Sequence, residues 1–187
     1  MRKNFGPHEW GYPMPVYMIG TYNEDGSANV MNAAWGGISN TAEISFCISH
    51  SHKTAENVVK AGAFTVSIAT EDYISPCDYV GIVSGNKDKD KLSKAGFTAI
   101  KSEYVNAPII KELPLALECE VISYDYDTER LVGRIVNVSI AEEILTDNDK
   151  VDVRAMKPII FDPVNLKYWS FGEIVGSAYR DGKSLIK

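Results

Sequence analysis

The sequence lacks long hydrophobic runs and contains few cysteines. Within its 187 residues no apolar stretch approaches the roughly 20 that a bilayer-spanning helix needs, and residues 1–7 lack the apolar core of a secretory signal peptide. Cys47, Cys77 and Cys119 are odd in number and far apart, which favours buried, reduced thiols over a disulfide framework or a Cys-x-x-Cys site. These absences predict a cytoplasmic protein that does not enter a membrane.

Two common nucleotide-binding motifs are also missing. Neither Gly-x-x-x-x-Gly-Lys-[Ser/Thr] nor Gly-x-Gly-x-x-Gly occurs, so neither a P-loop nor a Rossmann fold has support. No Ser-His-Asp or Cys-His arrangement is justified by spacing, and we predict no catalytic side chain. The net charge of −6 is spread over separate acidic residues, which argues against general nucleic-acid binding.

What the sequence does contain is a succession of short strand patterns. Asp25-Gly26 between two apolar runs predicts a hairpin. Further strands are expected at residues 44–49, 64–69, 115–121 and 131–140, and short helices at 54–61, 75–83 and 89–96. Many strands with only short helices indicate a mainly β fold, a closed or split barrel. We expect one barrel domain over residues 1–157 and a C-terminal tail, residues 158–187, that packs on the barrel or on a partner subunit.

Residues 49–54 combine hydroxyl groups, one lysine and the start of a helix. Backbone N–H groups at a helix start are free to bind an anion, and Ser51, Lys53 and Thr54 can add hydrogen bonds and charge, so the segment suits a phosphate monoester. On this segment alone, an ordinary helix start capped by Ser51 or Thr54 is the simpler interpretation.

His50 and His52 could point the same way in an extended strand, but no third ligand is placed by spacing, and we predict no metal centre. They would instead line the anion site or face solvent.

Residues 29–37 place small residues, amides and one tryptophan at the end of a strand. A flat heterocycle could lie against such a strand and bind its exposed backbone groups. Close packing inside a barrel would favour the same small residues. The aromatic residues Tyr168, Trp169 and Phe171 could cover such a ring, or belong to the core or an interface.

Taken in order, these segments resemble the flavin reductase-like family with its FMN-binding split barrel, in particular the flavoredoxin branch. The resemblance rests on residues 15–20, 25–26, 32–35, 49–54 with Asn57, 64–67, 84–85, 90–91, 106–108 and 117–119. It implies a six-stranded Greek-key barrel and a homodimer with FMN at the subunit interface. The residues implied to bind FMN are Met31, Asn32, Ala33, Ala34 and Trp35 at the ring, Ser49, His50, Ser51, Lys53 and Thr54 at the phosphate, and Tyr168 and Trp169 beside the flavin.

One departure from the family bears on the electron donor. Many short flavin reductases carry an Asp-His pair before the Gly-x-Val of a late strand, close to the nicotinamide, whereas residues 130–136 contain neither Asp nor His. The first hypothesis is an NAD(P)H-dependent oxidoreductase that passes electrons through FMN to free flavin or another acceptor. The second is an FMN-containing electron carrier that is reduced by a partner protein. A third is a non-enzymatic module that binds another phosphorylated or metal-containing ligand.

Overall fold

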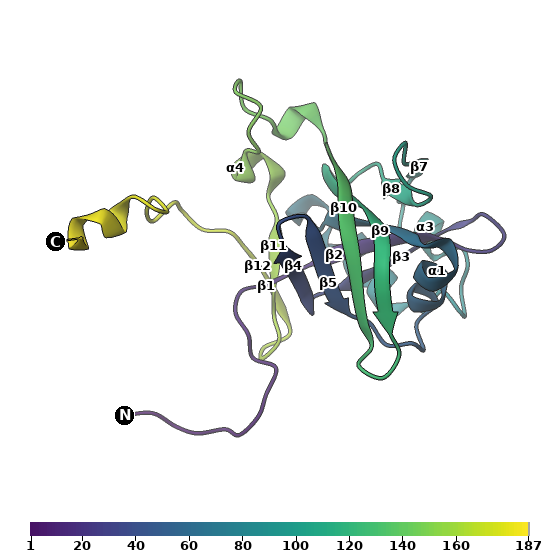
Figure 1. Ribbon diagram of the computed structural model, residues 1–187, viewed down its shortest axis with the longest axis horizontal. Coiled ribbons are helices and arrows are strands. Elements are labelled where there is room, and N and C mark those ends of the chain that lie inside the picture. Colours follow the sequence, from purple (N-terminus) through teal and green to yellow (C-terminus); the bar gives the residue numbers. More distant parts are fainter. Residues whose placement is uncertain (187) are drawn as a thin grey trace.

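A curled antiparallel sheet forms the body of the protein (Figure 1). The computed structural model describes residues 1–186. Seven strands pair in the order β3-β2-β6-β9-β10-β5-β4, with two free edges, β3 and β4. The strands are β2 (Tyr17–Tyr22), β3 (Ala28–Ala33), β4 (Gly36–Asn40), β5 (Glu43–Cys47), β6 (Ala63–Ile68), β9 (Leu115–Asp125) and β10 (Arg130–Ile140). This confirms the mainly β split barrel.

The strand number differs from the expected six because β4 forms an additional edge strand. β4 pairs with β5, with a register shift between Ile38 and Asn40. Its sequence, Gly-Gly-Ile-Ser-Asn, has no apolar alternation, and Ile38 is exposed. A strand with one edge and both faces largely open to solvent leaves no period-two hydrophobic pattern in the sequence.

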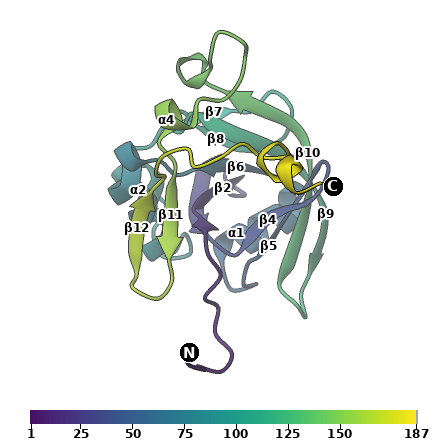
Figure 2. The same ribbon diagram turned by 90° about the vertical axis from the view of Figure 1, so that its left-hand side faces the viewer.

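Two smaller sheets flank the barrel. β1 (Met14–Pro15), β11 (Ile159–Asp162) and β12 (Lys167–Ser170) form one, and β7 (Ala99–Lys101) and β8 (Pro108–Ile110) form the other. Figure 2 shows the β11–β12 hairpin beside α2. The predicted C-terminal tail therefore begins with a hairpin that pairs with β1, and residues 171–186 belong to no sheet.

The helices are short, as expected. They are α1 (Lys53–Ala61), η1 (Glu71–Tyr73), α2 (Ile74–Ile82), α3 (Lys91–Lys94), α4 (Val153–Met156), η2 (Glu142–Ile144) and η3 (Asp181–Leu185). α1 ends where Gly62 takes a left-handed φ of 67° and its N–H binds the carbonyl of Val58, a helix ending that glycine favours. Among residues 1–186, no helix combines the length and hydrophobicity that crossing a bilayer would take.

The core has two main parts. Inside the curled sheet, Phe64, Ile19 and Leu131 pack with α1, and the other face of β2 and β3 packs Val30 and Met18 against α2. Both parts contain one cysteine, and burial raises the pKa of Cys77 and of Cys119 to about 12. The expectation that all three thiols are buried is wrong for Cys47, which is exposed because it follows the inward-facing Phe46 on β5.

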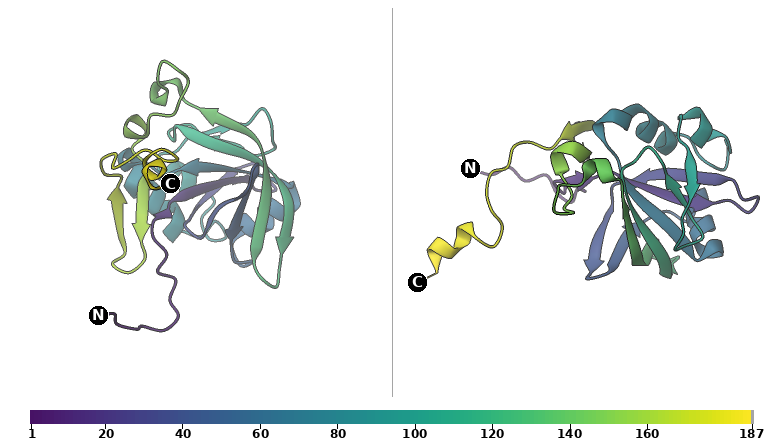
Figure 3. Two further views of the ribbon diagram at one scale, coloured as in Figure 1. Left: turned by 60° about the vertical axis from the view of Figure 1, so that its left-hand side comes forward. Right: turned by 90° about the horizontal axis from the view of Figure 1, so that it is seen from above.

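Both ends of the chain leave the barrel on the side opposite α1 (Figures 1 and 3). Residues 171–186, here called the C-terminal arm, are exposed throughout. Five of the arm's large apolar side chains are more than three-quarters exposed: Ile174, Val175, Tyr179, Leu185 and Ile186. Apolar side chains that gather on an exposed surface are a common feature of contact sites.

Candidate functional site

Two adjoining cavities lie along β3, and they share Gly81 and Ile82 at the end of α2. The larger, of about 460 Å³, is lined by Val16, Asn32, Ala33, Ala34, Asp78, Gly81, Ile82, Phe161, Leu166 and Tyr168. The smaller, of about 180 Å³, is lined by Asn29, Met31, His52, Lys53, Thr54, Val80, Gly81, Ile82, Val83, Ser84, Gly85 and Lys91. Together they form an elongated site that can take a long ligand.

At the larger cavity the ligand would meet the free edge of the sheet. β3 pairs only with β2, so alternate N–H and C=O groups on its other side have no sheet partner. The small side chains of Ala33 and Ala34 leave that backbone accessible. The Asn32 side chain donates to the carbonyl of Cys77 at 3.2 Å, and a Cβ at Gly81 would lie 2.2 Å from Asn32 Oδ1. Gly81 therefore lets α2 approach β3 closely.

At the smaller cavity two lysines concentrate positive charge. Lys91 is only 3% exposed, and its Nζ donates to the carbonyls of Val80 at 3.0 Å and Val83 at 3.1 Å. Its burial lowers the pKa of Lys91 to about 8. Lys53 lies in the first turn of α1 and pairs with Glu56 at 3.0 Å. No carboxylate occurs among the described residues that line this cavity, so the cavity suits an anion.

A buried amide borders the same cavity. Asn29 Nδ2 donates to Thr54 Oγ1 at 2.8 Å, which fixes the threonine at the helix start. Asn29 Oδ1 is buried without a hydrogen-bond partner, and a Cβ at Gly85 would lie 2.4 Å from it. Unsatisfied buried acceptors are rare, so this oxygen beside the smaller cavity is an unusual feature of the site.

The β11–β12 hairpin forms one wall of the larger cavity. The Tyr168 hydroxyl donates to Asp78 Oδ1 on α2 at 2.7 Å, and the rings of Phe161 and Tyr168 lie 6.0 Å apart. Burial, and secondly the hydrogen bond to Asp78, raise the pKa of Tyr168, so the phenol stays protonated at neutral pH. The hairpin therefore holds an aromatic wall against α2.

The structure brings together part of the predicted site. The predicted residues that line the two cavities are Met31, Asn32, Ala33, Ala34, Lys53, Thr54 and Tyr168. The alternative interpretation, with Ser51 or Thr54 as the helix cap, is wrong: His52 is the N-cap residue, and no side chain makes a capping bond.

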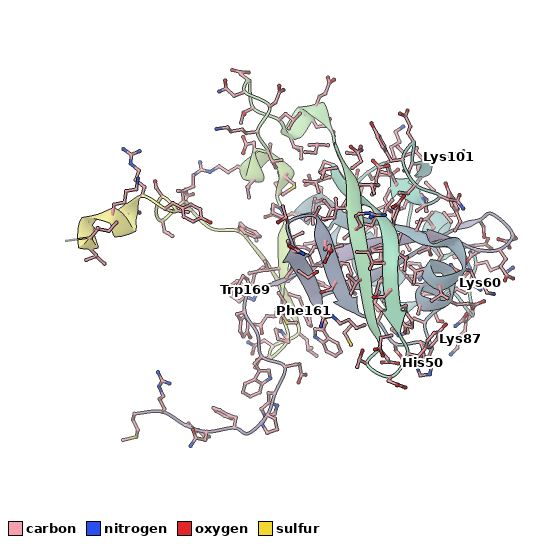
Figure 4. The ribbon with its side chains drawn as sticks, in the orientation of Figure 1. His50, Lys60, Lys87, Lys101, Phe161 and Trp169 are labelled. Atoms are coloured by element: carbon pink, nitrogen blue, oxygen red, sulfur yellow. The ribbon has the colours of Figure 1, made fainter. Side chains whose placement is uncertain are left out.

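Five predicted residues lie outside these cavities. Ser49 and His50 bind Glu129 of the β9–β10 turn, at 2.7 Å from Ser49 Oγ and 2.8 Å from His50 Nδ1. Ser51 is within 3.1 Å of Ser49. Trp35 lines a shallow groove beside β4, and Trp169 is exposed on β12. Figure 4 shows His50 near the β9–β10 turn, away from Phe161 and Trp169. Contact of these five with FMN stays a prediction.

The sequence reasoning assigned no role to several lining residues, chiefly Asp78, Gly81, Gly85 and Lys91. Residues 84–85 and 90–91 carried the family resemblance, but no local pattern showed that a lysine far along the chain returns to the start of α1. Within residues 1–186, no three His, Cys, Asp or Glu side chains group closely enough to share a metal ion.

A split barrel with an elongated cleft along its edge strand defines the class of protein. Residues 10–162 match the family described as "Flavin reductase like domain", and the chain belongs to the flavin reductase-like family. It is similar to the flavoredoxin of Desulfovibrio vulgaris (Miyazaki F), with 34% identity over 97% of this chain and 100% of that chain and a TM-score of 0.93.

Two further similarities agree. The flavoredoxin of Methanosarcina acetivorans is 30% identical, over 100% of this chain and 98% of that chain, with a TM-score of 0.87. A protein of Archaeoglobus fulgidus is 31% identical over 140 residues, which are 70% of this chain and 75% of the relative. The flavoredoxin branch expected from the sequence is thus confirmed.

Proposed function

We propose that the protein binds FMN in the two adjoining cavities and works as a flavin-dependent redox protein. The observation that supports this proposal is that the two ends of the cleft differ in their chemistry. One end holds two lysines and a helix start with no carboxylate, and the other presents free strand backbone beneath aromatic residues. A phosphate fits the first end and a flat heterocycle with polar edges fits the second.

Each end would hold one part of FMN. The backbone of Asn32, Ala33 and Ala34 would bind the ring edge, while Lys53 and Lys91 would bind the phosphate with help from Thr54. The ribityl chain of FMN, which joins the ring to the phosphate, would pass Gly81, where the two cavities meet. Its hydroxyls would come near Asn29, whose buried oxygen has no other partner.

The bound flavin would supply the electron and hydride chemistry, and the protein would bind, orient and shield it. N–H groups on the free edge of β3 can donate to ring acceptors, which stabilises added negative charge. Val16, Ile82, Phe161 and Leu166 line the larger cavity and would pack against the bound ring. None of these functions requires a side-chain acid or base, and the absence of a catalytic side chain stays a prediction.

The proposed activity is transfer of electrons from NADH or NADPH through FMN to free flavin or another acceptor. A carrier reduced by a protein partner is the second candidate. It is favoured by the missing Asp-His pair. It is also favoured because Arg134, which could otherwise bind the phosphate of a dinucleotide, already pairs with Glu120 at 2.7 Å. A cytoplasmic location stays a prediction.

The visible spectrum of FMN-loaded protein under anaerobic conditions separates the candidates. We expect yellow protein whose oxidised-flavin band disappears within seconds when NADH or NADPH is added. A yellow complex that only dithionite or a partner protein reduces would support the carrier. Protein that stays colourless with FMN would contradict both and support a module for another ligand.

We also propose a homodimer in which the C-terminal arm packs on the partner subunit. The arm contacts its own barrel region through the ion pair of Glu173 with Arg154, yet its apolar residues are exposed. Light scattering should give twice the mass of one chain, and a variant that ends after Ser170 should give a single-chain mass. A single-chain mass for the full-length, FMN-loaded protein would contradict the dimer.

A further inference from the structure

A carboxylate shares the cavity in which the flavin ring would bind. Asp78 is the only acidic residue among the described residues that line the larger cavity, where it joins Asn32, Ala33 and Ala34. It lies on α2, the helix that also forms the passage to the smaller cavity. A charge in this position acts on whatever charge develops on the bound ring.

Little near Asp78 neutralises its charge. Within residues 1–186 Asp78 belongs to no salt bridge. Its hydrogen bond comes from the neutral Tyr168 hydroxyl at 2.7 Å, across the cavity wall from β12. The two lysines lie in the smaller cavity, where Lys91 is engaged by helix carbonyls. Among the described residues, no cation in a salt bridge therefore offsets the carboxylate beside the ring site, and the Tyr168 hydroxyl fixes its position.

We infer that Asp78 lowers the reduction potential of bound FMN and that Tyr168 moderates this effect. The inference rests on the proposed FMN site. Two-electron reduction with uptake of one proton adds two electrons and one proton, which leaves one more negative charge on the flavin. A nearby carboxylate opposes that charge by Coulomb repulsion, and charge near the reactive ring is a principal means by which proteins tune flavins. Asp78 therefore weakens the binding of reduced FMN more than that of oxidised FMN, compared with a site that lacks this carboxylate.

The test is the midpoint potential of FMN bound to four proteins, measured at equilibrium with a reference dye. They are the wild type, Asp78→Asn, Tyr168→Phe and the control Glu120→Gln, which removes a carboxylate outside both cavities. Asp78→Asn keeps the side-chain shape and should shift the potential in the positive direction. The ratio of reduced to oxidised affinity should rise about tenfold, which equals about 30 mV for a two-electron couple.

Tyr168→Phe separates the charge from a merely structural role. Loss of the hydroxyl leaves the Asp78 charge less neutralised, so the potential should move in the negative direction, opposite to Asp78→Asn. Glu120→Gln should leave it unchanged. An unshifted potential in Asp78→Asn, or the same positive shift in Tyr168→Phe, would overturn this inference but would leave the proposed FMN site standing. Wild-type protein that fails to bind FMN would overturn the proposed function and the inference with it.

Discussion

Lys53→Ala and Lys91→Met are each expected to weaken FMN binding by about 1 to 3 kcal/mol, the scale of a hydrogen bond to a charged group. That corresponds to a loss of roughly fivefold to 150-fold. Both lysines line the smaller cavity, where the FMN phosphate has no other charged partner in the proposed site. Methionine at position 91 preserves much of the buried stem of the lysine. Fluorescence titration of the flavin-free protein measures the affinity.

Riboflavin and Lys60→Ala are the matched controls. Riboflavin lacks the phosphate, so its affinity should be the same in all variants. Lys60 lies on the same helix as Lys53 but is exposed and pairs with Glu24 and Glu56 (Figure 4), and its replacement should leave FMN affinity unchanged. An equal loss for riboflavin would show that the variants disturb the cavity itself, and an unchanged FMN affinity would contradict the phosphate assignment.

The same titration across pH tests Lys91 directly. The second pKa of a phosphate monoester is about 6, so the flavin phosphate is close to fully charged above about pH 7, while the pKa of Lys91 lies at about 8 in the flavin-free protein. FMN affinity should therefore be highest between about pH 7 and 8 and fall between pH 8 and about 10, as Lys91 loses its proton. In Lys91→Met this fall should be absent. A fall of the same size in that variant would assign the titration to another group.

Phe64→Ala is expected to lower the free energy of unfolding by about 3 to 5 kcal/mol, the usual result of removing a buried aromatic ring. Phe64 is fully buried on β6, and its ring lies so close to Gly133 that a Cβ there would be 2.3 Å from it. Gly133 pairs with both β5 and β9, which restrains the backbone of β10 from moving into the space that the ring would leave. Urea unfolding without flavin measures the effect, since a bound ligand would add its own stabilisation.

Val59→Ala provides the control for this prediction. Val59 lies on the outer side of α1 and is 42% exposed, so its replacement should change the free energy of unfolding by less than about 0.5 kcal/mol. A similarly small effect of Phe64→Ala would mean that the barrel interior can collapse around the missing ring.

Where a structural feature arises from neighbouring residues, it could be predicted from the sequence. The turn at Asp25-Gly26 joins β2 and β3, and Gly62 ends α1. Both features depend on backbone conformations that glycine adopts readily. The strand patterns at residues 115–121 and 131–140 likewise predicted β9 and β10, which pair with each other. β4 was missed because an exposed edge strand needs no apolar face.

Some residues of the candidate site could likewise be predicted from the local sequence, and others could not. Lys53 and Thr54 could be found because they belong to one short segment at a helix start, where the chemistry of an anion site is local. Asn32 and Ala33 were found through a strand of small residues and the family resemblance. Asp78 and Lys91 could not be assigned, because their roles depend on how α2 and α3 pack against β3.

The sequence by itself determined the barrel strands other than β4, the helices α1 to α3, the turn at Asp25-Gly26 and the family, because these follow from local backbone preferences and from motifs in order along the chain. Only the tertiary structure decided which residues share a cavity. It separated Ser49 and His50, held by Glu129, from Lys53, and it brought Lys91 to that lysine and Tyr168 to Asp78. Residues of like chemistry in one segment can point to different partners, and contacts between distant segments depend on the packing of whole elements.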